Sequence, residues 1–159
     1  MKKKKIILIK HGEYRNTPPF DLSEDGKNDI CKLAIEIMPE IRGKEMLCIT
    51  SMIRYARQST QILQEIWQKN GISVVFEERY EVWSGTDARD ELSEGEKIVF
   101  YDSIWFKNFL ETTHQEVIII VTHKKFVEDF LNSLEFPNRS IKNGQAIIAD
   151  LKIKEHDVV

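Results

Sequence analysis

Short aliphatic runs alternate with longer amphipathic stretches along this chain. Runs of about five residues that are rich in Ile and Val predict strands buried on both faces. The predicted strands lie near residues 5–10, 46–50, 72–76, 116–122 and 144–153. Helical patterns lie between them, and strands that alternate with helices favour crossover connections and a mostly parallel sheet. We therefore predict a single α/β domain over residues 1–159.

The helical patterns have recognisable ends. The first helix begins after Ser23, a capping residue that two carboxylates follow, and it ends near Pro39. The second begins near Ser51, which could cap it, and closes at Asn70-Gly71. Two further patterns cover residues 95–113, where the period is less regular, and 124–134. The stretch from Glu77 to Glu94 fits neither period, so we interpret it either as a functional excursion over the sheet edge or as a plain connecting loop.

The composition narrows the class of protein. The chain has 159 residues and a net charge of −3, which suits one domain and does not favour broad binding to nucleic acid. No segment approaches the ~20 apolar residues that span a bilayer. The apolar run after the lysines at 2–5 is shorter than the ~7–15 residues of a secretory signal. Cys31 and Cys48 have no metal-ligand spacing and fit buried positions, so we expect a cytoplasmic protein without a disulfide or a metal site.

Two histidines follow two of the aliphatic runs. His11 comes after the strand at 5–10, and His123 comes after the strand at 116–122. Ligands of open α/β folds bind at the carboxyl ends of parallel strands, so the two imidazoles could meet over one substrate. Lys10 and Arg15 add positive charge beside His11, which disfavours the imidazolium and keeps the ring nucleophilic. Taken alone, however, a histidine such as His11 is more often a satisfied core or loop residue.

A second candidate group follows the strand at 46–50. The start of a helix offers free backbone N–H groups to an anion. Arg54 and Arg57 lie three residues apart on that helix and share a face, where their forked donors suit phosphate. The alternative is a pair of solvated arginines on an exposed helix face.

These residues together resemble the histidine phosphatase superfamily, also called phosphoglycerate mutase-like. The motifs in order are Lys-His-Gly-Glu at 10–13, Leu-Ser-Glu-Asp-Gly at 22–26, Ser51 with Ala-Arg-Gln-Ser at 56–59, and Val-Thr-His at 121–123. The resemblance spans about residues 5 to 135. It implies a three-layer α/β/α fold with a mostly parallel central sheet, and a size like that of the small phosphohistidine phosphatases.

The resemblance also implies roles for individual residues. His11 would be the phosphorylated nucleophile and His123 its partner in the phosphate pocket, with no metal and no cofactor. The proton donor would be an acidic residue upstream of Trp83, where the spacing points to Glu77 and leaves Glu78 and Glu81 as rivals. Lys10, Arg15, Arg54 and Arg57 are the candidate substrate-binding residues.

Three departures from the family pattern bear on activity. Lys10 stands in place of an arginine and keeps the charge without the forked donors. Tyr55 falls where the family has a second arginine, and a helix turns ~100° per residue, so its neighbours cannot replace it without rearrangement. Lys124 and Lys125 stand where small glycines are usual. The phosphate pocket is therefore expected to be degenerate.

Three functions follow from these expectations. The first is a phosphatase that hydrolyses a phosphomonoester or phosphoramidate through a phosphohistidine at His11, acting on a phosphorylated small molecule or a phosphoprotein. The second is a non-catalytic phosphate-binding or protein-interaction module on the same fold, a pseudophosphatase. A mutase is disfavoured because a short chain leaves little room for loops that retain a bisphosphate. The sequence indicates neither nucleic acid nor a membrane as a partner.

Overall fold

The computed structural model describes residues 2–79, 82, 103–133 and 140–153. Strands and helices alternate along these residues, as the hydrophobic pattern predicts. The elements are β1 (Lys2–Lys10), α1 (Glu24–Ile41), β2 (Met46–Thr50), α2 (Arg54–Lys69), β3 (Val75–Glu78), α3 (Ser103–Thr112), β4 (Val117–Thr122), α4 (Lys124–Ser133) and β5 (Ala146–Ile153).

The strands form one five-stranded sheet in the order β3-β2-β4-β1-β5. β1, β2, β3 and β4 run parallel to one another, and β5 runs antiparallel to β1 at one edge. The fold class is therefore α/β with a mostly parallel central sheet, as predicted. β1 and β4 are neighbours in this sheet, and Lys10 is paired with Thr122 in their register. The residue after each of these strands is a histidine.

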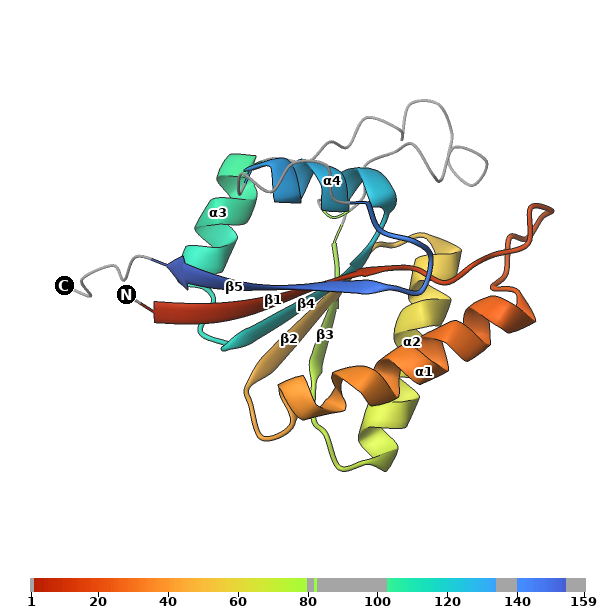
Figure 1. The fold of residues 1–159 in the computed structure, drawn as a ribbon, viewed down its shortest axis with the longest axis horizontal. Coiled ribbons are helices and arrows are strands. Elements are labelled where there is room, and N and C mark those ends of the chain that lie inside the picture. Colours follow the sequence, from red (N-terminus) through yellow and green to blue (C-terminus); the bar gives the residue numbers. More distant parts are fainter. Residues whose placement is uncertain (1, 80–81, 83–102, 134–139, 154–159) are drawn as a thin grey trace.

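Two helical layers cover the sheet, α1 and α2 on one side and α3 and α4 on the other (Figure 1). Alternate residues of one strand enter the two cores: Ile7 and Ile9 pack in the core on the α1–α2 side, and Ile6 and Leu8 pack in the opposite core. Burying such a side chain contributes about 1.5–3 kcal/mol. This two-sided burial is the physical reason why the strands read as continuous aliphatic runs.

The boundaries of the first two helices differ from the prediction. α2 begins after Ile53, whose side chain makes no capping hydrogen bond, and Ser51 lies outside the helix. Pro39 lies inside α1, and the helix continues to Ile41. The side chain of Ile41 is buried, so the apolar face of α1 extends beyond the proline.

The region after α2 also differs from the prediction. The third strand covers 75–78, so Glu77 and Glu78 belong to an edge strand and not to an excursion. The remainder of the predicted excursion lies outside the described residues, apart from residues 79 and 82. Of the predicted helix at 95–113, residues 103–112 form α3, and 95–102 lie outside the described residues. Within the described ranges, no helix is long and apolar enough to cross a membrane.

Two glycines bring the start of α1 against the loop that follows β1. A Cβ atom on Gly26 would lie 2.1 Å from the carbonyl oxygen of Glu13, and one on Gly12 would lie 2.9 Å from the carbonyl oxygen of Gly26. Gly12 has no positive φ, so its small size serves this close approach and not an unusual turn. Ser23 caps α1 as predicted, and its Oγ accepts a hydrogen bond from the backbone N–H of Gly26 at 3.0 Å. This packing fixes the backbone next to His11.

Candidate functional site

The structure brings His11 and His123 together at the carboxyl edge of the sheet. The backbone N–H of His11 donates to the carbonyl of Thr122 at 3.1 Å, which extends the ladder between β1 and β4 by one residue. The two imidazole centroids lie 5.1 Å apart, with their planes at 60°. Both side chains are buried. Two residues that are distant in sequence are thus neighbours because their strands are.

The hydrogen bond of His11 defines its tautomer. Nδ1 of His11 lies 2.9 Å from the carbonyl oxygen of Gly12. A carbonyl can only accept, so Nδ1 carries the proton, and in the neutral ring the lone pair is then on Nε2. The imidazole is therefore held in the form whose Nε2 can act as a nucleophile.

His123 is held by a hydroxyl group. Its Nε2 lies 2.8 Å from Oγ of Ser51, and this Oγ also accepts a hydrogen bond from the backbone N–H of Ile53 at 3.3 Å. Burial lowers the pKa of His123 well below its usual range, and the nearby His11 and Lys10 lower this pKa further. His123 is therefore neutral at physiological pH. A neutral ring can donate a hydrogen bond from one nitrogen and accept at the other.

An aromatic stack covers His11 on one side. The ring of Tyr55 lies 4.4 Å from that of His11, centroid to centroid, and the ring of Tyr14 stacks on Tyr55 at 3.9 Å with an angle of only 4° between the planes. Tyr55 is buried and packs with Leu22 and Ile53 in a small apolar cluster. The position at which the family resemblance expects an arginine is thus filled by an aromatic ring that touches the candidate nucleophile.

Lys10 and Arg15 flank the histidine on the chain but differ in position. Lys10 ends β1 and is half-buried, and its charge contributes to the low pKa of His123. Arg15 is exposed, and its backbone N–H donates to the carbonyl of Asp21 at 2.8 Å. Lys10 therefore acts electrostatically on His123, whereas Arg15 lies in the segment between β1 and α1.

Arg54 joins α2 to the segment before α1. Its Nε donates to Oδ1 of Asp21 at 2.6 Å, and Nε2 of Gln58 donates to the same oxygen at 2.7 Å. Oε1 of Gln58 in turn accepts from the backbone N–H of Leu22 at 2.8 Å. The donors from Arg54 and Gln58 hold the pKa of the Asp21 carboxyl below its usual range. The guanidinium of Arg54 is thus bound to a carboxylate of the segment between β1 and α1.

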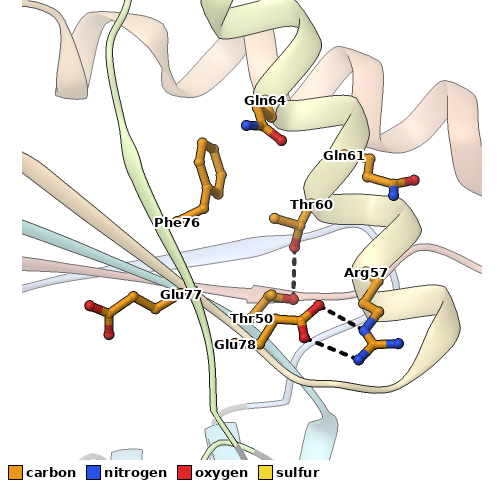
Figure 2. Close-up of a pocket in the computed structure, with 8 residues that line it drawn as sticks. All are labelled: Thr50, Arg57, Thr60, Gln61, Gln64, Phe76, Glu77 and Glu78. Carbon is orange, nitrogen blue, oxygen red and sulfur yellow. Dashed lines mark hydrogen bonds and ion pairs between the residues drawn. The ribbon is translucent and has the colours of Figure 1, made fainter.

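Arg57 is also bound to a carboxylate, on the side of α2 that faces β3. Its Nε and Nη2 lie 2.8 and 3.0 Å from the two carboxylate oxygens of Glu78. The pair lies at a cavity of about 210 Å³ between α2 and β3, which Thr50 and Thr60 also line (Figure 2). The hydroxyl of Thr60 donates to that of Thr50 at 2.8 Å, as the dashed line in Figure 2 marks.

Glu77, the first candidate proton donor, lies on β3, and its carboxylate points away from Glu78 and Arg57 (Figure 2). This carboxylate accepts hydrogen bonds from Nε and Nη2 of Arg79 at 3.2 and 3.0 Å. The rival Glu78 is engaged with Arg57, and the rival Glu81 lies outside the described residues. Each of the two described candidates is thus paired with an arginine.

Two features of this site were not predicted from the sequence. Ser51 was interpreted as a helix cap, but its hydroxyl holds His123. The stack of Tyr14 on Tyr55 had no signal in the sequence, because it depends on the path of the segment after β1. Among the residues that the structure describes, no three His, Cys, Asp or Glu side chains are grouped as a set of metal ligands.

No protein-family model matches this chain, and no curated protein matches it either. Solved structures match it over most of its length. A protein histidine phosphatase SixA in complex with tungstate has a TM-score of 0.65 at 12% identity, covering 91% of this chain and 94% of the other. A mycobacterial glucosyl-3-phosphoglycerate phosphatase has a TM-score of 0.60 at 11% identity, with coverages of 91% and 90%. A mutant phosphoserine phosphatase from Entamoeba histolytica, in complex with phosphoserine, has a TM-score of 0.57 at 14% identity, with coverages of 91% and 89%.

The topology and these likenesses together define the fold. The chain is a three-layer α/β/α protein with a mostly parallel sheet. More particularly, it has the phosphoglycerate mutase-like fold of the histidine phosphatase superfamily, as the order of its motifs predicts. At these sequence identities the comparison establishes the fold, and the activity has to be argued from the site itself.

Proposed function

We propose that this protein is a phosphatase that hydrolyses a phosphomonoester or a phosphoramidate through a phosphohistidine at His11. The observation that carries the proposal is the hydrogen bond from Nδ1 of His11 to the Gly12 carbonyl, 2.9 Å long, beside the second buried imidazole. It directs the lone pair of the neutral ring to Nε2, which is then the nitrogen available to attack phosphorus.

The reaction has two steps. Nε2 of His11 attacks phosphorus, the P–N bond forms as the bond to the leaving group breaks, and an acid protonates the leaving atom. Water then attacks the phosphohistidine, the P–N bond breaks, and inorganic phosphate leaves. His123 would donate a hydrogen bond to a phosphoryl oxygen, and Glu77 is the first candidate for the acid. Glu77 would have to separate from Arg79 to serve in this role.

Positive charge at the site supports a phosphorylated substrate. Lys10 lowers the pKa of His123, and Arg54 and Arg57 lie on the first turn of α2. Both arginines are engaged with carboxylates at the surface, so phosphate would have to compete with Asp21 or Glu78 for them. We propose a phosphorylated small molecule or a phosphoprotein as the substrate, in the cytoplasm.

An assay with para-nitrophenyl phosphate and a panel of phosphoramidates tests this function. We expect phosphate release by the wild-type protein and loss of at least about 100-fold in kcat for His11→Ala, because the nucleophile is removed. Quenching with alkali during turnover should trap a phosphoprotein at His11, because phosphohistidine is stable to base and labile to acid. Activity that survives in His11→Ala would contradict the proposal.

A second candidate function is a phosphate-binding or protein-interaction module without catalysis. The observation that favours it is the ring of Tyr55 against His11, where a guanidinium would otherwise stabilise the charge of the transition state. The two candidates differ in a simple measurement. The module would bind inorganic phosphate or vanadate in calorimetry while the wild type and His11→Ala show the same background rate of hydrolysis.

A further inference from the structure

The ring of Tyr55 contacts those of Tyr14 and His11, and it is nearer to His11 than the ring of Tyr14, whose centroid lies 5.6 Å from that of His11. The ring of Tyr55 is 3.9 Å from that of Tyr14, in a parallel stack, and 4.4 Å from that of His11, at 60°. Only 1% of Tyr55 is exposed. We propose that Tyr55 is a positioning residue that fixes the imidazole of His11 for attack through Nε2. This inference rests on the proposed function of His11 as a nucleophile.

The hydrogen bond of His11 does not by itself fix the plane of the imidazole ring. Its acceptor is the carbonyl of the next residue, Gly12, so the bond holds one ring nitrogen, and contacts from other elements hold the rest of the ring. Tyr55 belongs to α2, which packs against the sheet and α1. A ring contact from that helix fixes the imidazole plane relative to the rest of the fold, whereas the Gly12 carbonyl selects the tautomer.

Tyr55 is itself well held. Its side chain packs with Leu22 and Ile53, and its backbone carbonyl accepts a hydrogen bond from Oγ of Ser59 at 2.8 Å. The same Oγ accepts from the backbone N–H of Gly12 at 3.0 Å. One serine therefore ties the helical turn that carries Tyr55 to the residue that follows His11.

Removal of the ring should change catalysis more than binding. In Tyr55→Leu the buried position stays apolar, but the aromatic ring nearest to His11 is lost, and the edge contact of Tyr14 with His11 remains. A misplacement of about 1 Å costs on the order of 100-fold in rate, so we expect kcat to fall about 10- to 100-fold and KM to stay within about threefold. Tyr55→Phe keeps the ring and should retain most of kcat.

Nitrogen-15 spectra of the histidine rings test positioning independently of activity. In the wild type and Tyr55→Phe, His11 should show one tautomer, with the proton on Nδ1. In Tyr55→Leu the shifts of both nitrogens should move toward the average of the two tautomers, because a ring that tilts loses its alignment with the Gly12 carbonyl.

Tyr55→Met is a second ringless variant in case Tyr55→Leu is not folded. Phe109→Leu, which changes a half-buried ring on α3, is the matched control and should leave the His11 shifts unchanged.

The outcomes separate the positioning role of Tyr55 from the proposed phosphatase function. A folded Tyr55→Leu or Tyr55→Met protein with wild-type His11 shifts and wild-type kcat would overturn the positioning role. If the wild type itself does not release phosphate but His11 changes tautomer in the ringless variants, the proposed phosphatase function fails and the positioning role remains.

Discussion

Oγ of Ser51 lies 2.8 Å from Nε2 of His123, and both side chains are fully buried. Ser51 follows β2 and His123 follows β4, which are neighbours in the sheet, so the contact spans two strand ends. The backbone N–H of Ser51 also donates to the carbonyl of Val121 at 3.0 Å. The second imidazole of the site is therefore held by the framework of the sheet and does not depend on a surface loop.

Ser51→Ala should destabilise the protein. The substitution removes the hydroxyl partner of a buried imidazole nitrogen, and leaving a buried polar group unsatisfied costs about 1–3 kcal/mol. Urea denaturation measures the free energy of unfolding. Ser73→Ala, at an exposed position before β3, is the matched control and should stay within about 0.5 kcal/mol of the wild type. Equal stability of the Ser51 and Ser73 variants would contradict this role of the hydroxyl.

The low pKa of His123 makes stability depend on pH. The unfolded chain takes up a proton on this histidine near pH 6.5, whereas the folded protein, with burial, His11 and Lys10 all opposing the charge, does not. Above about pH 6.5 the histidine is neutral in both states, and below it the free energy of unfolding falls with a limiting slope of about 1.4 kcal/mol per pH unit. Urea denaturation between about pH 7.5 and 5.5 measures the slope.

His123→Gln provides the control for this pH dependence, because glutamine does not titrate. The variant should be less stable than the wild type at neutral pH, since an amide does not fill the buried site of the ring, but its free energy of unfolding should fall less steeply as the pH is lowered. The same slope in both proteins would show that groups other than His123 account for the pH dependence.

The sequence allowed the pairing of His11 with His123 to be predicted, but not its surroundings. Each histidine follows a strand whose residues are aliphatic on both faces, so the strands, and the edge at which the histidines lie, can be predicted from a local pattern. The position of Tyr55 against His11 depends on the rotation of α2 about its axis. The stack of Tyr14 on Tyr55 depends on the course of the segment between β1 and α1. The helical period of α2 places Tyr55 on a buried face but does not indicate which residue it contacts, and the course of the segment leaves no periodic signal.

The strand at 75–78 was also not fully predictable from a local sequence pattern. It pairs with Leu47 to Thr50 of β2 at one edge of the sheet, so Val75 and Glu78 remain exposed. A polar edge strand lacks the aliphatic signature of the central strands. For this reason Glu77 and Glu78 were interpreted as part of an excursion. The acidic partners of the two arginines on α2 were unpredictable too, because they lie on other parts of the chain.

Asp21→Asn should loosen the segment between β1 and α1. The carboxylate accepts from both Arg54 and Gln58, and these donors lower its pKa, so its contribution is present near neutral pH and is lost as acid protonates it. Hydrogen exchange should be faster in residues 13–22 of the variant. Glu65→Gln, at an exposed position of α2, is the control and should leave exchange in this segment unchanged.

Gly26→Ala should destabilise the protein even though Gly26 lies in a helix. In an exposed helix interior, alanine is more favourable than glycine by about 1 kcal/mol. Here the new Cβ would lie 2.1 Å from the carbonyl oxygen of Glu13, which is backbone and cannot rotate away. Overpacking of this kind costs about 1–3 kcal/mol, so alanine is expected to be less favourable than glycine at this position. Asn28→Ala, at an exposed position of the same helix, is the control and should be neutral or stabilising in thermal denaturation. A Gly26→Ala protein as stable as the wild type would mean that α1 does not approach the segment after His11 this closely.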